Sequence, residues 1–211
     1  MTITWNVPGL PFPVSPSAEG VWALVDEPPA VTASAGRHTD IFIDPTAGTA
    51  GSTLDPAATL NAPTLLGLPP DGDFQFSARV SVEFGATYDA GVLLLWIDER
   101  HWGKLCFELS PDGEPMIVSV VARGVADDAN AFVVGARTAW LRVSRIDRAF
   151  AYHASVDGRA WRMIRYFTVD GPSKPVTIGF EAQSPMGEGC AVTFDDIRFS
   201  ATRLAELRDG S

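Results

Sequence analysis

The stretch HWGKLCFELSPDG (101–113) carries opposite charges and a large aromatic ring within one short segment of alternating polarity. If the segment forms a β-strand, successive side chains point to opposite faces, so Leu105 and Phe107 share the apolar face. The other face then carries an indole, an ammonium, a thiol and a carboxylate, from Trp102, Lys104, Cys106 and Glu108. Such a face is either solvated, with ion pairs worth only about 0.2–1 kcal/mol, or one wall of a binding groove.

Three more expected strands, 116–123, 139–146 and 175–183, combine an apolar face with a polar one. Their apolar positions, which alternation turns toward the core, are Val118, Val120, Leu141, Val143, Ile178, Phe180 and Ala182. Their outward positions are Ser119, Val121, Arg123, Trp140, Arg142, Ser144, Glu181 and Gln183. If several of these strands adjoin strand 102–109 in one sheet, their outward faces form a shared groove.

Two dipeptides with carboxylates are expected at strand ends. Tyr88-Asp89 precedes the apolar strand 90–97, and Asp127-Asp128 follows strand 116–123 in an expected loop. Paired carboxylates at such positions accept hydrogen bonds from hydroxyl groups or bind Ca²⁺, although adjacent Asp residues are also common in turns. One loop supplies too few ligands for a cation, so we predict no metal site.

The outward residues suit a carbohydrate or another small polyol. Charged and amide side chains satisfy ligand hydroxyls, and the face of a Trp ring covers the apolar C–H patch of a sugar. The predicted ligand-binding residues are Tyr88, Asp89, Trp102, Lys104, Glu108, Arg123, Asp127, Asp128, Arg142 and Gln183.

Catalysis has weaker support in the sequence. A retaining glycosidase needs an acid and a nucleophilic carboxylate about 5 Å apart. The segment TDIFID (39–44) places Asp40 and Asp44 on one face, but FELS (107–110) supplies only Glu108. No strand carries the carboxylate pair in the expected form, so we predict no catalytic residue. A hydrolase that uses Glu108 remains an alternative.

Composition and charge exclude several classes of protein. The net charge of −10 over 211 residues repels phosphate, which argues against nucleic acid and anionic membranes as partners. No apolar run approaches the ~20 residues that span a bilayer, and the N-terminus lacks the pattern of a signal peptide. We therefore expect a cytoplasmic protein with Cys106 and Cys190 as free thiols. The scattered His residues and the absence of a phosphate loop predict no zinc and no cofactor.

Short alternating segments separated by Gly, Pro and Asp predict an all-β protein. About twelve strands at regular spacing favour a single antiparallel β-sandwich of jelly-roll type over residues 1–211. The turns SPDGE (110–114) and Asp157-Gly158 have the chemistry of hairpin connections.

Several of these segments, in this order, resemble a known family. They are TDIFIDP (39–45), YDAGVLLLWIDERHWGKLCFEL (88–109), IVSVVARGVADD (117–128), LRVSRI (141–146), SVDGRAW (155–161) and GFEAQSP (179–185). The chain is similar over roughly residues 20–200 to a concanavalin A-like domain family of unknown function that includes a protein named for the regulation of enolase. The resemblance implies a lectin/glucanase-type sandwich with one concave sheet, and Ala126 replaces the serine that usually precedes the Asp pair.

Three functions follow as hypotheses. The first is a non-catalytic domain that binds a carbohydrate or sugar-like polyol in the groove of the concave sheet. The second is a glycoside hydrolase-like enzyme that uses Glu108. The third is a protein-interaction or regulatory domain of metabolism, which only the enolase-linked family name suggests. The hypotheses that need a pocket assume that Lys104 and Glu108 point into one hollow shared with Arg123 and Gln183.

Overall fold

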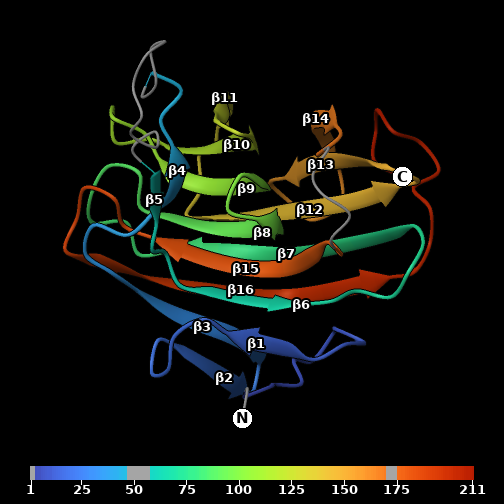
Figure 1. Cartoon of the computed structure of the whole chain (residues 1–211), viewed down its shortest axis with the longest axis horizontal. Coiled ribbons are helices and arrows are strands. Elements are labelled where there is room, and N and C mark those ends of the chain that lie inside the picture. Colours follow the sequence, from blue (N-terminus) through green and yellow to red (C-terminus); the bar gives the residue numbers. More distant parts are fainter. Residues whose placement is uncertain (1–2, 47–57, 170–174) are drawn as a thin grey trace.

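The computed structural model describes residues 3–46, 58–169 and 175–211 and contains sixteen strands and no helix within them. The predicted antiparallel β-sandwich is confirmed (Figure 1). The strands are β1 (Val14–Pro16), β2 (Trp22–Asp26), β3 (Pro29–Gly36), β4 (Ile41–Ile43), β5 (Ala58–Leu60), β6 (Thr64–Gly67), β7 (Phe74–Val82), β8 (Ala90–Asp98), β9 (His101–Leu109), β10 (Pro115–Arg123), β11 (Ala126–Val133), β12 (Thr138–Ile146), β13 (Ala149–Ser155), β14 (Arg162–Phe167), β15 (Thr177–Gln183) and β16 (Gly189–Ser200).

Two seven-stranded sheets form the layers of the sandwich. Sheet A has the strand order β1-β6-β15-β8-β9-β10-β11, and sheet B has the order β14-β13-β12-β7-β16-β3-β2. The hairpin of β4 and β5 forms a separate two-stranded sheet. In the described part of the chain, no helix is long and apolar enough to cross a membrane.

The main core lies between the inner faces of the two sheets. Strand β7 buries every second residue from Phe74 to Val82, as its sequence alternation predicts. Phe76 of sheet B meets Phe180 of sheet A edge-to-face, with ring centroids 5.4 Å apart. Gly91 lies where the sheets approach closely, because a Cβ there would come within 2.6 Å of side chains of Val80 and Val192. Burial of apolar side chains from both sheets therefore holds the sandwich together.

A second apolar cluster covers the outer face of sheet A. Ile41 and Ile43 of the β4–β5 hairpin pack on it, and the cluster includes Val92 and Leu94 of β8 and Val118 and Val120 of β10. The hairpin lies in front of these strands in Figure 1. The outer face of sheet A is therefore a covered surface, whereas the sequence predicts an open groove.

Two sequence-based predictions about β10 and its neighbour are wrong. Val118 and Val120 point to the outer face, whereas Ile117 and Val121 enter the main core. Both faces of β10 are apolar, so alternation does not show which face is buried between the sheets. The expected loop that carries Asp127 and Asp128 is strand β11, which pairs with β10 along the edge of sheet A.

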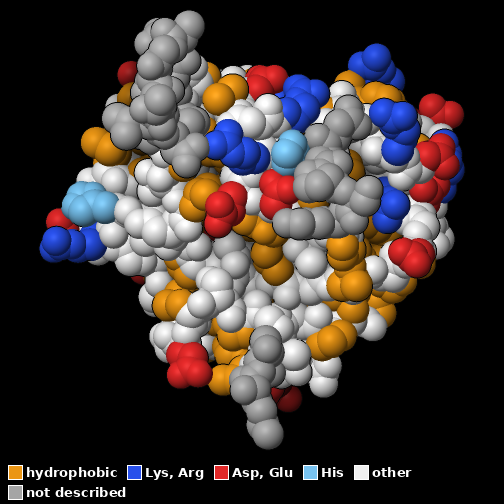
Figure 2. Space-filling view, viewed as in Figure 1, with side chains coloured by type: hydrophobic (Ala, Val, Ile, Leu, Met, Phe, Trp, Pro, Cys, Tyr) orange, Lys and Arg blue, Asp and Glu red, His pale blue; other side chains and the backbone are white. Residues whose placement is uncertain are grey.

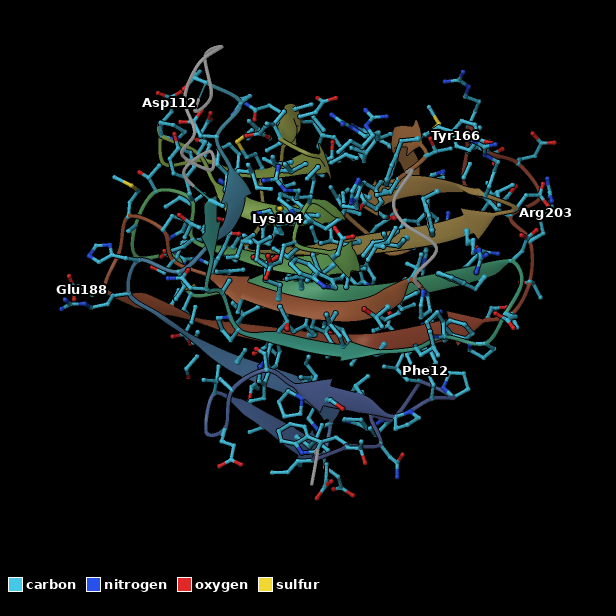
Figure 3. All side chains as sticks on the ribbon, in the orientation of Figure 1. Phe12, Lys104, Asp112, Tyr166, Glu188 and Arg203 are labelled. Carbon is cyan, nitrogen blue, oxygen red and sulfur yellow. The ribbon has the colours of Figure 1, made fainter. Side chains whose placement is uncertain are left out.

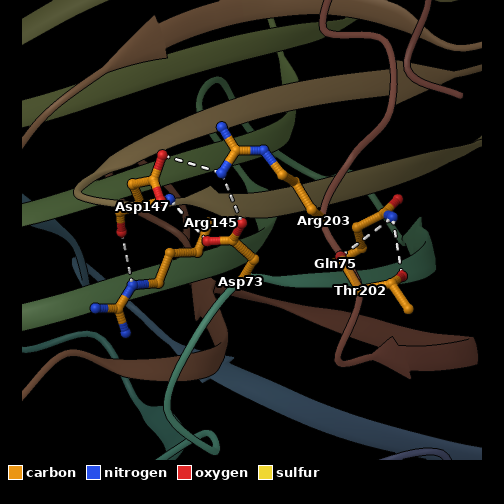
Figure 4. A network of polar contacts seen from close by, with 6 residues as sticks. All are labelled: Asp73, Gln75, Arg145, Asp147, Thr202 and Arg203. Atoms are coloured by element: carbon orange, nitrogen blue, oxygen red, sulfur yellow. Dashed lines mark hydrogen bonds and ion pairs between the residues drawn. The ribbon is translucent and has the colours of Figure 1, made fainter.

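A polar network on sheet B holds the segment that follows β16 (Figure 4). The Nη1 atom of Arg203 lies 3.1 Å from Asp73 Oδ2 and 3.0 Å from Asp147 Oδ2. Gln75 Nε2 donates weakly to the carbonyl oxygen and the hydroxyl of Thr202. These contacts are exposed, so each contributes little to stability on its own.

Candidate functional site around Lys104

Three strands of sheet A, β15, β9 and β11, bring charged side chains together on its outer face. Opposite positions in the ladder form rows, and one row runs Gln183–Ala90–Glu108 across β15, β8 and β9. The next row runs Glu181–Val92–Cys106, and a third joins Leu94, Lys104, Val120 and Asp128. Adjacent strands lie about 4.8 Å apart, so these side chains are neighbours.

Lys104 is the centre of this group and lies near β4 in Figure 3. Its side chain is buried, with 2% exposure, and its Nζ atom donates to Asp40 Oδ1 at 2.9 Å and to Gln183 Oε1 at 2.8 Å. The same ammonium lies 5.8 Å from the centroid of the Trp102 ring. Burial alone would lower the pKa of Lys104, but the charges of Glu181 and Asp40 outweigh it and raise the pKa above its usual value. Lys104 is therefore a permanent buried cation.

Several carboxylates surround this one cation. We use the name Lys104 cluster for Lys104 with Asp40, Glu108, Asp128, Glu181 and Gln183. Burial raises the pKa of both Glu108 and Glu181 to about 8, although the positive charge of Lys104 opposes the shift. Burial also raises the pKa of Asp128. At neutral pH these acids are therefore protonated to a greater extent than ordinary carboxyl groups.

The cluster holds more hydrogen-bond acceptors than its own donors satisfy. Glu181 is fully buried, and neither of its carboxyl oxygens has a hydrogen-bond partner among the described residues. Glu108 likewise accepts no hydrogen bond from the part of the chain that the structure describes. Buried acceptors without donors are rare, and each one calls for an explanation. A donor from outside the chain can reach only the less covered members of the cluster, Glu108 and the exposed Asp128, because Glu181 is fully buried.

The hairpin divides the outer face into two regions. Asp40, next to β4, points to Lys104, whereas its neighbours Thr39 and Ile41 line a hollow of about 580 Å³ on the other side. Trp96, Leu66 and Asn61 also line this hollow. On the opposite side of the cluster, Asp128 on the edge strand β11 is exposed. Figure 2 shows acidic and basic side chains interspersed with hydrophobic ones on the described surface of this face.

Part of the predicted residue set does meet in the Lys104 cluster. Lys104, Glu108, Asp128 and Gln183 belong to it, and the fully buried Trp102 lies beside it and donates from Nε1 to the carbonyl oxygen of Glu99. The prediction that Leu105 and Phe107 face the core while Lys104 and Glu108 face outward is confirmed. The prediction of one shared hollow is wrong for Arg123. This residue lies apart from the cluster at the end of β10, and its side chain is 47% exposed.

Other predicted residues have different roles. Asp127 faces Arg123 and Arg165 at 3.7 and 3.4 Å, at the edge of sheet A. Asp89 is buried and holds the local loop, since its carboxylate accepts from the backbone of Gly85 and Ala86 and from the hydroxyl of Ser184. Tyr88 contributes only its carbonyl oxygen, which accepts from Gln183 Nε2 at 3.2 Å.

Arg142 lies in the wrong sheet for the predicted groove. Strand β12 belongs to sheet B, so its outward face points away from the Lys104 cluster on the opposite side of the sandwich. Alternation correctly identifies Arg142 as outward, but it does not show which sheet contains the strand. The assignment of Arg142 to this groove is therefore incorrect.

Asp40 and Glu181 are the members of the cluster that the predicted set lacks. The alternation of the sequence places both side chains on the outward face, but the predicted site does not include either of them. The signal that could have found them is strand β8, whose segment AGVLLLWI is apolar on both faces. Such a strand has both faces covered, and a charged residue beside it must be buried with a partner.

The described residues offer no obvious metal centre or reactive thiol. No group of three or more His, Cys, Asp or Glu side chains within residues 3–46, 58–169 and 175–211 is arranged to hold a metal ion. Cys106 and Cys190 are free and buried. Burial raises the pKa of the Cys106 thiol and raises that of Cys190 to about 12, so neither is an activated nucleophile.

Comparison with known proteins matches the resemblance inferred from the sequence. The model of a family described as "Protein of unknown function (DUF1349)" matches residues 21–202. Regulation of enolase protein 1 from Saccharomyces cerevisiae is 30% identical over 145 residues, which cover 68% of this chain and 72% of that protein. The crystal structure of a functionally unknown protein from the same yeast superposes with a TM-score of 0.70 and 26% identity, covering 85% of this chain and 92% of the other.

Larger proteins contain a similar sandwich. The glycoside hydrolase family 43 protein BlXynB from Bacillus licheniformis superposes with a TM-score of 0.71 at 15% identity, over 94% of this chain and 38% of that one. At this identity the likeness concerns the fold alone. The sandwich described here thus corresponds to little more than a third of that hydrolase.

Proposed function

Since the chain belongs to the DUF1349 family of proteins of unknown function, we propose its function from the Lys104 cluster: a non-catalytic domain that binds a carbohydrate or a similar polyol on the outer face of sheet A. The observation that carries the proposal is the carboxyl group of Glu108, which accepts no hydrogen bond from the described residues and lies beside the exposed Asp128. Ligand hydroxyls supply the donors that this set lacks.

Each part of the site has a role in this proposal. Glu108 and the exposed Asp128 receive ligand hydroxyls at the side of the cluster away from the hollow. Lys104 fixes the carboxylate of Asp40 and the amide of Gln183, so the polar groups are held in position before a ligand arrives.

A glycan array of neutral and acidic oligosaccharides, followed by calorimetry with the best binder, tests the proposal. Glu108→Gln keeps the size of the side chain but places an amide with two N–H donors where the carboxyl group has at most one O–H donor, so we expect at least about a tenfold loss of affinity. Glu114→Gln is the matched control, because Glu114 is exposed in the turn before β10. The proposal fails if no glycan binds, or if both variants bind as the wild type does.

One observation favours a second candidate, a glycoside hydrolase that uses Glu108. A pKa of about 8 keeps this carboxyl group protonated at neutral pH, as a general acid requires. Hydrolysis of reporter glycosides across a pH series would identify such an activity, which Glu108→Gln should abolish. A glycan that binds without being cleaved would favour the non-catalytic function instead.

The name of the yeast relative supports a third candidate, a regulatory domain that acts by binding a protein. Co-purification of enolase with this chain in a fixed ratio would favour it. Glu108→Gln should then leave the complex intact, because this candidate does not place the protein contact at the Lys104 cluster.

A further inference from the structure

A second polar hollow lies on the outer face of sheet B, on the side of the sandwich opposite the Lys104 cluster. Its volume is about 540 Å³, and Gln75, Ser77, Arg142, Trp161, Arg198 and Ser200 are among its lining residues. No acidic residue is among the described residues that line it, in a chain whose net charge is −10. The hollow is therefore a local region of positive charge on an acidic protein.

The sheet places these groups in register. Ser77 of β7 pairs with Arg142 of β12 on one side and with Arg198 of β16 on the other. Gln75 pairs with Ser200 in the next outward row. Two arginines thus flank a hydroxyl across three adjacent strands, and amide and hydroxyl groups lie one row away.

Arg142 is the unusual member of this set because it is buried without a counter-ion. Only 8% of the residue is exposed, and no carboxylate in the described part of the chain forms an ion pair with it. Its Nη1 donates to Gln75 Oε1 at 3.3 Å, its Nη2 donates to the carbonyl oxygen of Gly210, and its Nε has no acceptor. A buried cation that faces only neutral dipoles is costly unless something else supplies negative charge.

Aromatic contact holds the guanidinium in a fixed orientation. The Arg142 Cζ atom lies 4.1 Å from the centroid of the Trp161 ring, and Trp161 itself lines the hollow. Arg198 at the rim is already paired with Asp196 at 2.8 Å, so Arg142 carries the uncompensated charge. Burial lowers the pKa of Arg142 to about 10, which still leaves it charged at neutral pH.

We propose that this hollow binds a small organic anion, with its carboxylate or phosphate group against Arg142 and its apolar part against Trp161. Guanidinium groups recognise both kinds of oxyanion through several N–H donors. Ser77 and Gln75 supply the additional polar contacts. The site is independent of the Lys104 cluster, since the two lie on opposite faces of the sandwich.

Calorimetry with glucuronate, glucose and inorganic phosphate tests the assignment. Glucuronate should bind, and glucose, which has the same ring without the carboxylate, should not. Arg142→Gln should weaken glucuronate binding at least about tenfold, because it removes the positively charged donor that faces the carboxylate. Arg203→Gln removes the same charge from the exposed network of Figure 4 and should have no effect.

A second variant keeps the test decisive if Arg142→Gln does not fold. Ser77→Phe fills the hollow and leaves Arg142 in place, so it should abolish binding without removing charge. Competition by phosphate would identify a general oxyanion site, and its absence would identify a carboxylate site. The proposal is overturned if neither anion binds the wild-type protein, or if folded Arg142→Gln or Ser77→Phe binds as tightly as the wild type.

Discussion

The two outer faces of the sandwich each bury a cation, but they neutralise it in opposite ways. On sheet A, Lys104 has Asp40 and Gln183 as direct partners and further carboxylates nearby, under the cover of the β4–β5 hairpin. On sheet B, the polar and aromatic partners of Arg142 within the described residues are an amide oxygen, a carbonyl oxygen and an indole ring. One face has an excess of negative groups, and the other has an excess of positive charge.

This difference shows how similar strands can suit different ligands. A surplus of carboxyl acceptors favours ligands with hydroxyl donors, whereas an unpaired guanidinium favours an anion. It also predicts different consequences for folding. Removing Lys104 leaves the carboxylate of Asp40 without its ion-pair partner, but removing Arg142 leaves no unpaired ion behind.

Lys104→Met should give the largest effect and test this asymmetry directly. Breaking a buried ion pair by removal of one partner costs about 3–5 kcal/mol, because the remaining charges stay desolvated. Urea unfolding at neutral pH should show a loss of this size. The loss should grow as the pH rises above about 8, where Glu108 and Glu181 ionise and need the positive charge of Lys104. A loss below about 1 kcal/mol would mean that water already solvates the cluster.

Glu181→Gln should change the dependence of stability on pH. The folded pKa of Glu181, about 8, lies above the ordinary carboxyl value of 4.5, so the folded protein holds a proton that the unfolded chain releases. The stability from this proton is complete below the ordinary value and declines by roughly 1 kcal/mol per pH unit until the folded pKa is passed. Between about pH 5 and pH 8, the free energy of unfolding of Glu181→Gln should therefore fall less with rising pH than that of the wild type.

Glu188→Gln is the matched control for that titration. The side chain of Glu188 is 82% exposed, so its substitution should leave the pH dependence unchanged. Unfolding curves at several pH values measure both variants. Parallel pH profiles for Glu181→Gln and the wild type would contradict the placement of Glu181 as a buried, unpartnered acid.

The sandwich itself could be predicted because strand alternation and turn chemistry are local properties. The alternation in Phe74–Val82 assigned the buried face of β7 correctly, and Asp157-Gly158 marked the end of β13. Alternation could not predict which face of β10 packs in the main core. Both of its faces are apolar, and only the sheet order shows that a hairpin covers the outer one.

The candidate site could be predicted only in part because it depends on sheet membership. Lys104 and Glu108 share a strand, so their common face follows from the sequence. Their proximity to Gln183 depends on β15 lying beside β8, and Asp40 arrives from a hairpin outside both sheets. The sequence-based prediction puts Arg142 on the outer face of the wrong sheet, because no local pattern distinguishes an outward residue of sheet A from one of sheet B.

Arg142→Gln should give the smallest effect on stability and complete the comparison with Lys104→Met. The variant loses two hydrogen bonds and the contact with Trp161 but leaves no buried charge, so we expect a loss of about 1 kcal/mol in urea unfolding.

His153 lies opposite Arg142 on the neighbouring strand. Burial, together with the positive charge of Arg142, lowers the pKa of His153. Removal of the guanidinium should therefore raise the pKa of His153, which NMR titration of the imidazole can follow. If the two substitutions cost the same free energy, or if the pKa of His153 does not rise, the charge of Arg142 is compensated and the contrast between the faces is wrong.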